Sequence, residues 1–216
     1  LFAGLDVGSS RTKAAILDEN KQIIGLAIRK SGIDLAMASQ ECLRDALSEA
    51  GMPESLVTRM VSTGYGRNAV PGTSETKSEI ACHAKGCFHF FPTALSVVDI
   101  GGQDNKVIKI NAQGQRLSFK MNRKCAAGTG AFIEEMSQRL DISLERMNEL
   151  ALQSQKNVEF GSFCAVFTAT EVLEKVRGGA DVTDILRGLY RTVIQRILEM
   201  DTLTDRVAMT GGVVAH

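Results

Sequence analysis

Residues 6–10, Asp-Val-Gly-Ser-Ser, and residues 99–104, Asp-Ile-Gly-Gly-Gln-Asp, decide the fold of this chain. Each segment ends a short apolar run, 2–7 or 95–100, that is typical of a buried strand. Small residues between two apolar runs favour a tight hairpin, so each segment predicts a strand, a turn and a second strand. Because the two segments are alike, the sequence also predicts an internal repeat in which Asp99 corresponds to Asp6.

The predicted elements occur in the same order in both halves of the chain, with three strands followed by helices. Strands are expected at 2–7, 12–17, 23–28, 56–62, 95–100, 105–110, 116–121 and 206–209. Helices are expected at 35–50, 75–88, 130–140, 144–153, 167–177 and 182–198. The pattern predicts an α/β protein with two units, 1–92 and 93–216, that face each other across a cleft.

Composition excludes several classes of protein. The chain has 216 residues, 44% of them apolar, which suffices for one or two cores. Lys plus Arg and Asp plus Glu both number 25, so the formal net charge is zero and neither nucleic acid nor a membrane is an expected partner. No apolar run approaches the roughly 20 residues of a membrane-spanning helix. The short apolar start indicates a strand rather than a signal peptide, and the absence of an initiator methionine suggests missing residues.

The two hairpins carry groups that suit the binding of phosphate. Backbone N–H groups in turns rich in Gly and Ser can approach a phosphate without a clash with Cβ atoms. Ser9, Ser10 and Thr12 add hydroxyl donors, Lys13 adds a cation, and an Asp at a strand end can hold Mg²⁺ through water. A Walker A loop and a Rossmann turn are both excluded, because the motif is absent and strands follow the turns. With a third motif at 210–212 (TGG), the hairpins predict a polyphosphate clamp.

Five cysteines, an odd number, without a secretion signal predict reduced thiols and a cytoplasmic location. Cys125 and Cys164 each precede a predicted helix, whose dipole would stabilise a thiolate. An iron–sulfur cubane needs four ligands, so two cysteines per chain would form half a site that a symmetric dimer completes. The alternative is that both are buried core cysteines. Core packing is also the interpretation for Cys42, Cys82 and Cys87.

Four segments, 63–68 (TGYGRN), 97–106 (VVDIGGQDNK), 124–130 (KCAAGTG) and 209–213 (MTGGV), resemble a known family. They are similar to the ATPase activators of 2-hydroxyacyl-CoA dehydratases and the related ATPase subunits of benzoyl-CoA reductases. The resemblance spans essentially the whole chain. It implies two ribonuclease-H-like units of the actin, sugar kinase and Hsp70 type that enclose ATP. Family members continue past the position of His216, so the resemblance also implies a truncated C-terminus.

The resemblance implies a role for each motif. Asp6 and Asp99 would organise Mg²⁺, and Gln103 would orient the attacking water. Cys125 and Cys164 would bridge one 4Fe-4S cluster across a homodimer. The implied ATP-binding residues are Gly8, Ser9, Ser10, Thr12, Lys13, Gly101, Gly102, Asp104, Gly211 and Gly212.

The implied activity is ATP-driven transfer of a low-potential electron to a partner acyl-CoA dehydratase or reductase. A ferredoxin or flavodoxin would be the electron donor. Two alternatives share the hairpins and stay open: a small-molecule kinase of the sugar type, and an actin-like scaffold that uses ATP only as a switch. The kinase alternative gives no reason for the placement of the two thiols before helices.

Overall fold

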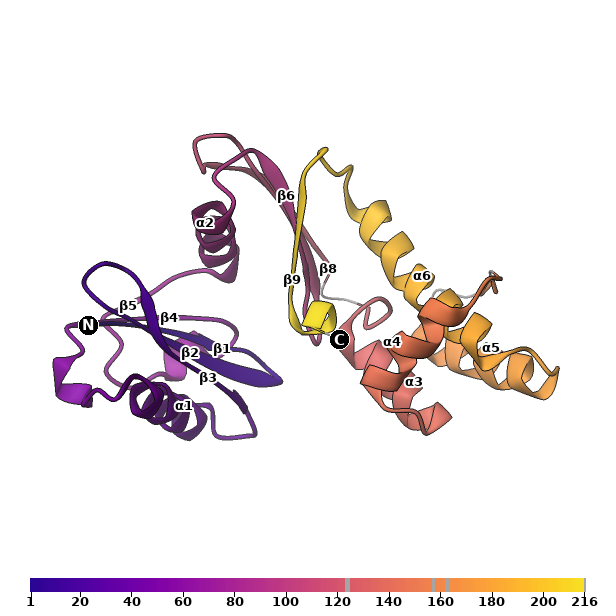
Figure 1. Ribbon diagram of the computed structural model, residues 1–216, viewed down its shortest axis with the longest axis horizontal. Coiled ribbons are helices and arrows are strands. Elements are labelled where there is room, and N and C mark those ends of the chain that lie inside the picture. Colours follow the sequence, from indigo (N-terminus) through magenta and orange to yellow (C-terminus); the bar gives the residue numbers. More distant parts are fainter. Residues whose placement is uncertain (123–124, 157, 162–163, 216) are drawn as a thin grey trace. The chain divides into compact units, whose positions relative to one another are not determined.

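The computed structural model describes residues 1–216 except 123–124, 157, 162–163 and 216 (Figure 1). The chain divides into two compact units, Leu1–Lys85 and Gly86–His216. Each unit contains its own β-sheet, which confirms the predicted α/β class. Among the described helices, none has both the length and the apolar character needed to cross a membrane.

The first unit is built on a sheet of strand order β3-β2-β1-β4-β5 (Figure 1). The strands are β1 (Phe2–Val7), β2 (Arg11–Leu17), β3 (Ile23–Lys30), β4 (Arg59–Thr63) and β5 (Glu75–Thr76). β1 runs antiparallel to β2 and parallel to β4. Alternate residues of β1 and β2 are buried, because successive side chains of a strand point to opposite faces of the sheet.

The helix α1 (Leu35–Ala50) packs on this buried face. It begins at Asp34, whose side chain accepts a hydrogen bond from the backbone N–H of Met37, and it ends at Gly51 in the left-handed conformation. Its apolar side buries Cys42 and Leu47 against the sheet. The core of the first unit therefore fixes the end of β1, from which the first hairpin begins.

The second unit has a sheet of strand order β8-β7-β6-β9. The strands are β6 (Leu95–Ile100), β7 (Asn105–Ile110), β8 (Arg116–Asn122) and β9 (Val207–Thr210). The helices are α2 (Glu79–Phe90), within which the two units divide, α3 (Gly130–Leu140), α4 (Leu144–Gln153), α5 (Ala165–Arg177) and α6 (Val182–Met200). Every residue of β6 is buried, as its continuous apolar sequence predicts.

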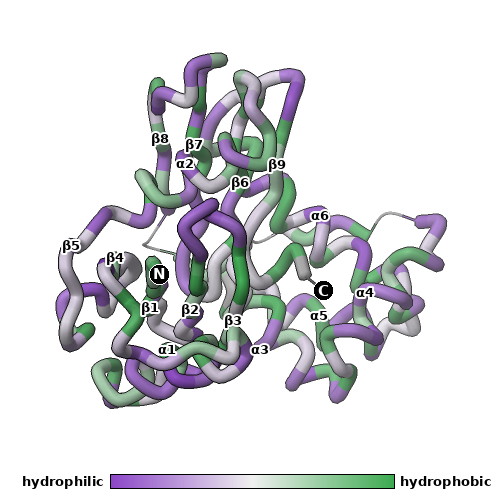
Figure 2. The backbone as a smooth tube through the Cα atoms, turned by 60° about the vertical axis from the view of Figure 1, so that its left-hand side comes forward, coloured by the Kyte–Doolittle hydropathy of each residue, from purple (hydrophilic) through white to green (hydrophobic). Residues whose placement is uncertain are grey.

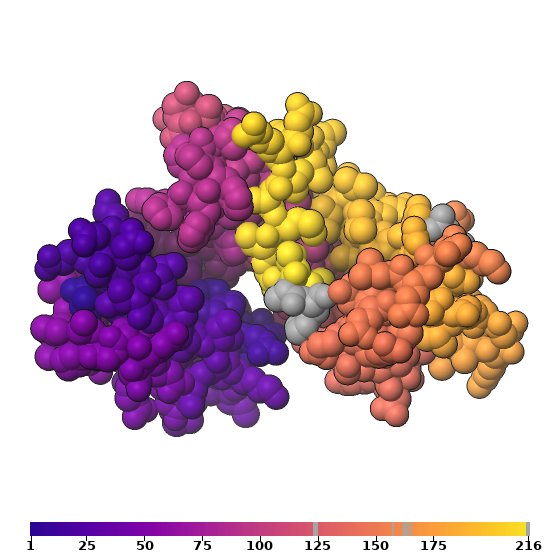
Figure 3. Space-filling view, viewed as in Figure 1, coloured from indigo at the N-terminus to yellow at the C-terminus, as the bar shows by residue number. Residues whose placement is uncertain are grey.

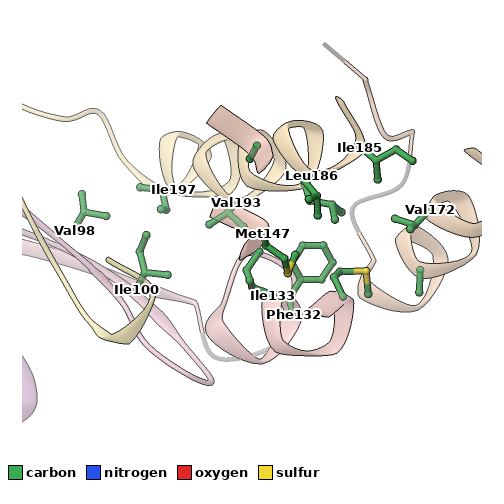
Figure 4. Close-up of a cluster of buried hydrophobic side chains, with 14 of the residues drawn as sticks. Val98, Ile100, Phe132, Ile133, Met147, Val172, Ile185, Leu186, Val193 and Ile197 are labelled. Atoms are coloured by element: carbon green, nitrogen blue, oxygen red, sulfur yellow. The ribbon is translucent and has the colours of Figure 1, made fainter. Parts of the chain in front are cut away.

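Helices α3 to α6 and one face of this sheet share a single core (Figure 4). Phe132 of α3, Met147 of α4 and Leu186 of α6 are almost fully buried within it. Along these helices hydrophilic and hydrophobic residues alternate (Figure 2), as expected for helices with one buried face. Each such buried side chain contributes about 1.5–3 kcal/mol, so this core holds the end of β6 and the start of α3 in place.

The structure confirms the predicted internal repeat. The strand order β3-β2-β1-β4 of the first unit corresponds to β8-β7-β6-β9 of the second. In register, Asp6 lies opposite Lys13 on β2 and next to Thr63 on β4. Asp99 likewise lies opposite Lys106 on β7 and next to Thr210 on β9.

Two predicted elements near the end of the first unit form with other bounds. The strand expected at 56–62 is β4, which begins only at Arg59, after a 3₁₀ turn at Glu54–Leu56. The helix expected at 75–88 begins only at Glu79, because Glu75 and Thr76 pair with β4 as strand β5. The carboxylate of Glu75 forms ion pairs with Arg59 and Lys77, which stabilises this short strand.

Candidate functional site

The first hairpin is a tight turn from Gly8 to Arg11. The backbone N–H of Gly8 donates to the carbonyl of Arg11 at 3.1 Å. A Cβ atom at Gly8 would lie 2.8 Å from that carbonyl oxygen, so the turn requires glycine. Ser9 and Ser10 at the tip are exposed, which leaves their hydroxyl and N–H groups accessible to a ligand.

Two other residues of the first hairpin have partners within the protein. The Nζ atom of Lys13 lies 2.8 Å from the Asp6 carboxylate, and both side chains are partly exposed to solvent. Thr12, expected to donate a hydroxyl to phosphate, is fully buried. Its hydroxyl forms a hydrogen bond with that of Ser31 at 3.0 Å, and Ser31 donates to the carbonyl of Gly8 at 2.7 Å. In this structure Thr12 therefore stabilises the hairpin through Ser31.

The second hairpin repeats this turn from Gly101 to Asp104. The N–H of Gly101 donates to the carbonyl of Asp104 at 2.9 Å, and a Cβ atom at Gly101 would lie 2.9 Å from that oxygen. Gly102 and Gln103 are exposed at the tip. The side chain of Gln103 is therefore accessible to a water molecule or a ligand there.

Asp99 forms the centre of a buried polar network under the second hairpin. Its two carboxylate oxygens accept hydrogen bonds from Thr210 and from Lys106, both at 3.1 Å. Lys106 Nζ also lies 2.7 Å from the carboxylate of Asp104. Asp99 is 4% exposed and Lys106 is 3% exposed, whereas Asp104 is half-buried.

The third glycine motif follows β9 in the second unit and lies at the surface (Figure 3). Gly211 has φ +98°, and a Cβ atom there would lie 2.2 Å from the carbonyl oxygen of Ile100. Gly212 begins a 3₁₀ turn and is exposed, with no atom within 4 Å of an added Cβ. In the first unit Gly64 has the same position after β4. Its φ is +93°, and a Cβ atom there would lie 2.4 Å from the carbonyl oxygen of Val7. Glycine is required at 64 and 211 because the chain crosses the neighbouring strand end closely.

The loop before α3 is hydrogen-bonded to the second hairpin. The N–H groups of Gly130 and Ala131, at the start of α3, donate to the carbonyls of Gly101 and Gly102, both at 2.9 Å. The side-chain amide of Asn105 donates to the carbonyl of Gly128 at 2.7 Å. These hydrogen bonds connect the second hairpin to the start of α3 and to the loop that follows Cys125.

The cysteines differ in their exposure. Cys42 and Cys87 are buried, and burial raises the pKa of both thiols, assisted by the negative charge of Asp45 at Cys42 and of Asp99 at Cys87. The core interpretation is confirmed for these two residues, while Cys82 is half-buried. Cys125 and Cys164 are exposed, so the alternative that they are core cysteines is wrong.

The two exposed cysteines have different relations to their helices. Cys164 is the N-cap of α5, and the side chains of Val166 and Phe167 in the first turn of this helix are apolar and exposed. Cys125 precedes the N-cap of α3, Thr129, by four residues, which confirms the prediction that it is followed by a helix at 130–140. Residues 123–124 and 162–163 lie outside the described residues. Within the described part of the chain, no three Cys, His, Asp or Glu side chains gather as a metal site.

Sequence reasoning missed Lys106, Thr210 and Gly64 as site residues. The repeat contained the signal, because Lys106 follows Asp99 at the spacing at which Lys13 follows Asp6. Their equivalence became visible only when the strand register was known.

Comparison with known proteins identifies relatives over almost the whole chain. The pattern of the BadF/BadG/BcrA/BcrD ATPase family matches residues 3–216. The chain is 37% identical to the activator of lactoyl-CoA dehydratase of Anaerotignum propionicum, covering 99% of this chain and 83% of that protein. It is 29% identical to one of the subunits of the benzoyl-CoA reductase of Thauera aromatica, covering 93% and 72%.

Solved structures agree with this result. The crystal structure of component A of the (R)-2-hydroxyglutaryl-CoA dehydratase of Acidaminococcus fermentans matches with a TM-score of 0.93 at 36% identity, over 98% of this chain and 83% of that one. The activator of the 2-hydroxyisocaproyl-CoA dehydratase from Clostridium difficile, with bound ADPNP, matches with a TM-score of 0.92 at 32% identity, over 99% and 80%. A sugar-acid kinase fold from Sinorhizobium meliloti matches with a TM-score of 0.53 at 14% identity, over 98% and 86%, which shows the shared fold alone.

Proposed function

Because the chain belongs to the BadF/BadG/BcrA/BcrD ATPase family, we propose that it is an activator that couples ATP hydrolysis to the transfer of a low-potential electron. The electron acceptor would be an acyl-CoA dehydratase or reductase, and the donor a ferredoxin or flavodoxin. The names of the relatives, dehydratase activators and a reductase subunit, support this class of partner. A cytoplasmic location is part of the same proposal.

ATP would bind to the two hairpins. The exposed tips offer hydroxyl and backbone N–H donors at Ser9, Ser10 and Gly102, and donors of these kinds suit phosphate oxygens. Gly101, whose N–H closes the turn, would let the backbone approach the phosphate without a Cβ atom in the way. Gln103 at the second tip would orient the attacking water, and Gly211 and Gly212 would lie against the nucleoside. The ADPNP bound to the Clostridium difficile relative supports a nucleotide site in this fold.

Mg²⁺ would be held by the aspartates of the hairpins. Carboxylate oxygens are the donors that Mg²⁺ prefers, and Asp6 and Asp104 present theirs with partial exposure, which suits a hydrated ion. Asp99 lies deeper and would act through water or through its neighbours. Since Asp104 carries only acceptor atoms, it would hold phosphate through the cation rather than directly. When bound, the ion neutralises the charge that develops on the phosphates.

A 4Fe-4S cluster would be held by Cys125 and Cys164 of each of two chains in a homodimer. Thiolates are the usual ligands of such a cluster, and in this structure these two cysteines are exposed while Cys42 and Cys87 are buried. Val166 and Phe167 beside Cys164 give this surface the apolar character expected of a subunit contact. When bound, the cluster supplies one-electron chemistry at low potential.

The single observation that carries the proposal is the hydrogen-bonded connection between the second hairpin and the loop of Cys125. The hairpin carbonyls of Gly101 and Gly102 accept hydrogen bonds from the first turn of α3, and Asn105 binds the loop at Gly128. A change at the phosphate hairpin therefore reaches the cysteine loop through few bonds. If the hairpin and the cysteine loop change conformation together, nucleotide can shift the equilibrium only by binding one conformation more tightly than the other.

The test is anaerobic purification with iron and sulfide counted per dimer, for the wild type and for Cys125→Ala and Cys164→Ala. Both variants should lose the cluster and its absorbance while their thermal unfolding stays close to that of the wild type. Cys82→Ala is the matched control, because this half-buried cysteine is not a proposed ligand. Full iron and sulfide in both ligand variants would refute the assignment. A colourless, iron-free wild type that phosphorylates a sugar would favour the kinase alternative.

A further inference from the structure

Asn105 is a buried polar residue that follows the second hairpin directly. It begins β7 and is 1% exposed. Its side-chain amide donates a hydrogen bond of 2.7 Å to the carbonyl of Gly128, in the loop between Cys125 and α3. The two groups fit closely, because a Cβ atom at Gly128 would lie 3.3 Å from the amide nitrogen of Asn105. A side chain, and not only the backbone, therefore connects the hairpin to this cysteine loop.

The other polar atom of this side chain shows that asparagine is a costly choice for stability at this position. Within the described part of the chain, the side-chain oxygen of Asn105 is buried and accepts no hydrogen bond. A buried acceptor without a donor costs about 1–3 kcal/mol, which an apolar side chain of the same shape would avoid. An unsatisfied group of this kind calls for an explanation other than the stability of the fold. The hydrogen bond to Gly128 provides one.

The loop that receives this hydrogen bond is itself held together. Thr129 donates to the carbonyl of Ala126 through both its backbone N–H, at 3.0 Å, and its hydroxyl, at 2.7 Å, which closes a turn. At the other end of the loop, the side chain of Asn122 on β8 donates to the carbonyl of Cys125 at 3.4 Å. Asn122 is the register partner of Asn105. Two asparagines that pair in register on β7 and β8 thus hold the two ends of the cysteine loop.

The first unit has an equivalent contact with a different target. Thr12 lies opposite Val7 in the first hairpin as Asn105 lies opposite Ile100 in the second. The buried hydroxyl of Thr12 is hydrogen-bonded at 3.0 Å to that of Ser31, in the segment that joins β3 to α1. Both units therefore hold the segment after their third strand with the first side chain beyond the hairpin turn. This segment contains a cysteine in the second unit but not in the first.

We propose that Asn105 is a positioning residue whose hydrogen bond to Gly128 makes the cysteine loop respond to nucleotide at the second hairpin. This inference rests on the proposed function, in which phosphate binds at the tip of that hairpin. Asn105 directly follows the turn in the chain, so a shift of the turn on phosphate binding moves its side chain, and the hydrogen bond moves the loop. The backbone hydrogen bonds between the hairpin and α3 hold the start of the helix, so they couple the helix and not the loop.

The experiment measures amide hydrogen exchange in the full chain, purified anaerobically, with and without ADPNP and Mg²⁺. Mass spectrometry follows one peptide that contains residues 125–129 and another from α3. In the wild type, ADPNP should change the exchange rates of both peptides by at least about fivefold. Asn105→Leu keeps the shape of the side chain without its hydrogen bond, so the response of the loop should fall below about twofold while that of α3 is retained. A merely structural role of Asn105 predicts instead that the two responses fall together.

Ser96→Ala is the matched control for lost stability. Ser96 is fully buried near the start of β6, at the end of the strand away from the hairpin, and its hydroxyl is hydrogen-bonded to that of Thr204 at 3.0 Å. The variant loses a buried hydrogen bond, which should lower the free energy of unfolding by about 1 kcal/mol. Its cysteine loop should nevertheless respond to ADPNP as that of the wild type does.

Two further measurements keep the test decisive. Asn105→Ser, whose shorter side chain does not span the distance to Gly128, should show the same separation of the two responses if Asn105→Leu fails to fold. Calorimetry measures ADPNP binding, which should be equal in the wild type and the variants. A folded variant whose loop responds as in the wild type would overturn the proposal, as would a folded variant that no longer binds ADPNP or a wild type that binds it without a response of the loop. A wild type that binds no ADPNP would refute the proposed function, and the inference with it.

Discussion

The hairpins of the two units have the same backbone and the same Asp–Lys pair, yet they place that pair in opposite environments. Lys13 and Asp6 meet at 2.8 Å with both side chains partly exposed. Lys106 and Asp99 meet at 3.1 Å and are almost completely buried. The backbone turn is therefore the part that the repeat retains, while the surroundings of the charges have diverged.

This difference separates two kinds of electrostatic behaviour. An exposed ion pair is worth little and exchanges its partners easily, so Lys13 can leave Asp6 for a phosphate oxygen. A buried pair is held by the cost of leaving either charge without its partner, so the pair of Lys106 and Asp99 resists rearrangement. The two hairpins therefore differ in how easily their charged side chains can change partners when a ligand binds.

The neighbouring threonines differ in the same way. Thr210 donates its hydroxyl to Asp99 at 3.1 Å. Thr63 occupies the equivalent position beside Asp6, and its hydroxyl is buried without a hydrogen-bond partner among the described residues. The network of the second unit is thus more completely bonded than that of the first.

The largest predicted effect concerns the part that both units share. Gly211→Ala and Gly64→Ala should each lower the free energy of unfolding by about 3 kcal/mol or more, because both glycines have positive φ and an added Cβ would overlap a backbone oxygen. Urea denaturation measures the loss. Gly212→Ala is the control and should change stability by no more than about 0.5 kcal/mol, since open space surrounds its position. If Gly64→Ala kept the stability of the wild type while Gly211→Ala lost it, the close approach of these glycines to the neighbouring strand end would not be equivalent in the two units.

The next effect should differ between the units. Asp99→Ala leaves Lys106 buried with one of its carboxylates gone, and it should destabilise the protein by about 3 kcal/mol. Asp6→Ala removes only a partly exposed pair and should cost no more than about 1 kcal/mol. Denaturation of both variants at one pH and salt concentration makes the comparison. Equal losses would contradict the assignment of the two environments.

The sequence predicted the turns because their chemistry is local. Gly8 and Gly101 close the same hairpin through one backbone hydrogen bond each, and the apolar runs before them become β1 and β6. The family, the α/β fold and the repeated order of strands followed from these local signals. Cys42 was also placed correctly, because its helix carries a regular apolar stripe.

The parts that sequence reasoning missed depend on tertiary contacts. Lys106 is buried beside Asp99 and Asp104 whereas Lys13 is exposed, and the equal spacing of the two lysines from Asp99 and Asp6 does not reveal this difference. Strand β5 consists of two residues and exists because β4 offers an edge for pairing.

A smaller effect concerns the anion preference of the first hairpin. Lys13→Met should weaken ATP binding about tenfold, because a charge-assisted hydrogen bond to phosphate is lost, while stability changes by no more than about 0.5 kcal/mol. Isothermal titration calorimetry measures the affinity. Lys21→Met, in the turn between β2 and β3, provides a lysine control and should bind ATP as the wild type does. Unchanged affinity in Lys13→Met would remove the cation of the first hairpin from the phosphate site.

The smallest effect comes from an ion pair outside both hairpins. Its contribution to stability can be compared with that of the buried pair of Lys106 and Asp99. Lys109 on β7 lies 2.8 Å from Asp201 at the end of α6, and its hydrogen bond lowers the pKa of Asp201 below the ordinary value. A lowered native pKa means that the stabilisation is complete above about pH 4 and is lost as the pH falls through that pKa. Lys109→Met should therefore be slightly less stable than the wild type at pH 7, and their unfolding free energies should converge below about pH 3.

Urea denaturation of the wild type and of Lys109→Met across this pH range tests the sign. A difference that stays constant with pH would mean that Lys109 stabilises the sheet by packing and not through its charge. The loss at pH 7 should also remain well below that of Asp99→Ala, because Lys109 and Asp201 are both more exposed than Lys106 and Asp99. If the two losses were equal, burial would not be what distinguishes the second hairpin, and the contrast with the first would have to rest on the additional carboxylate of Asp104 alone.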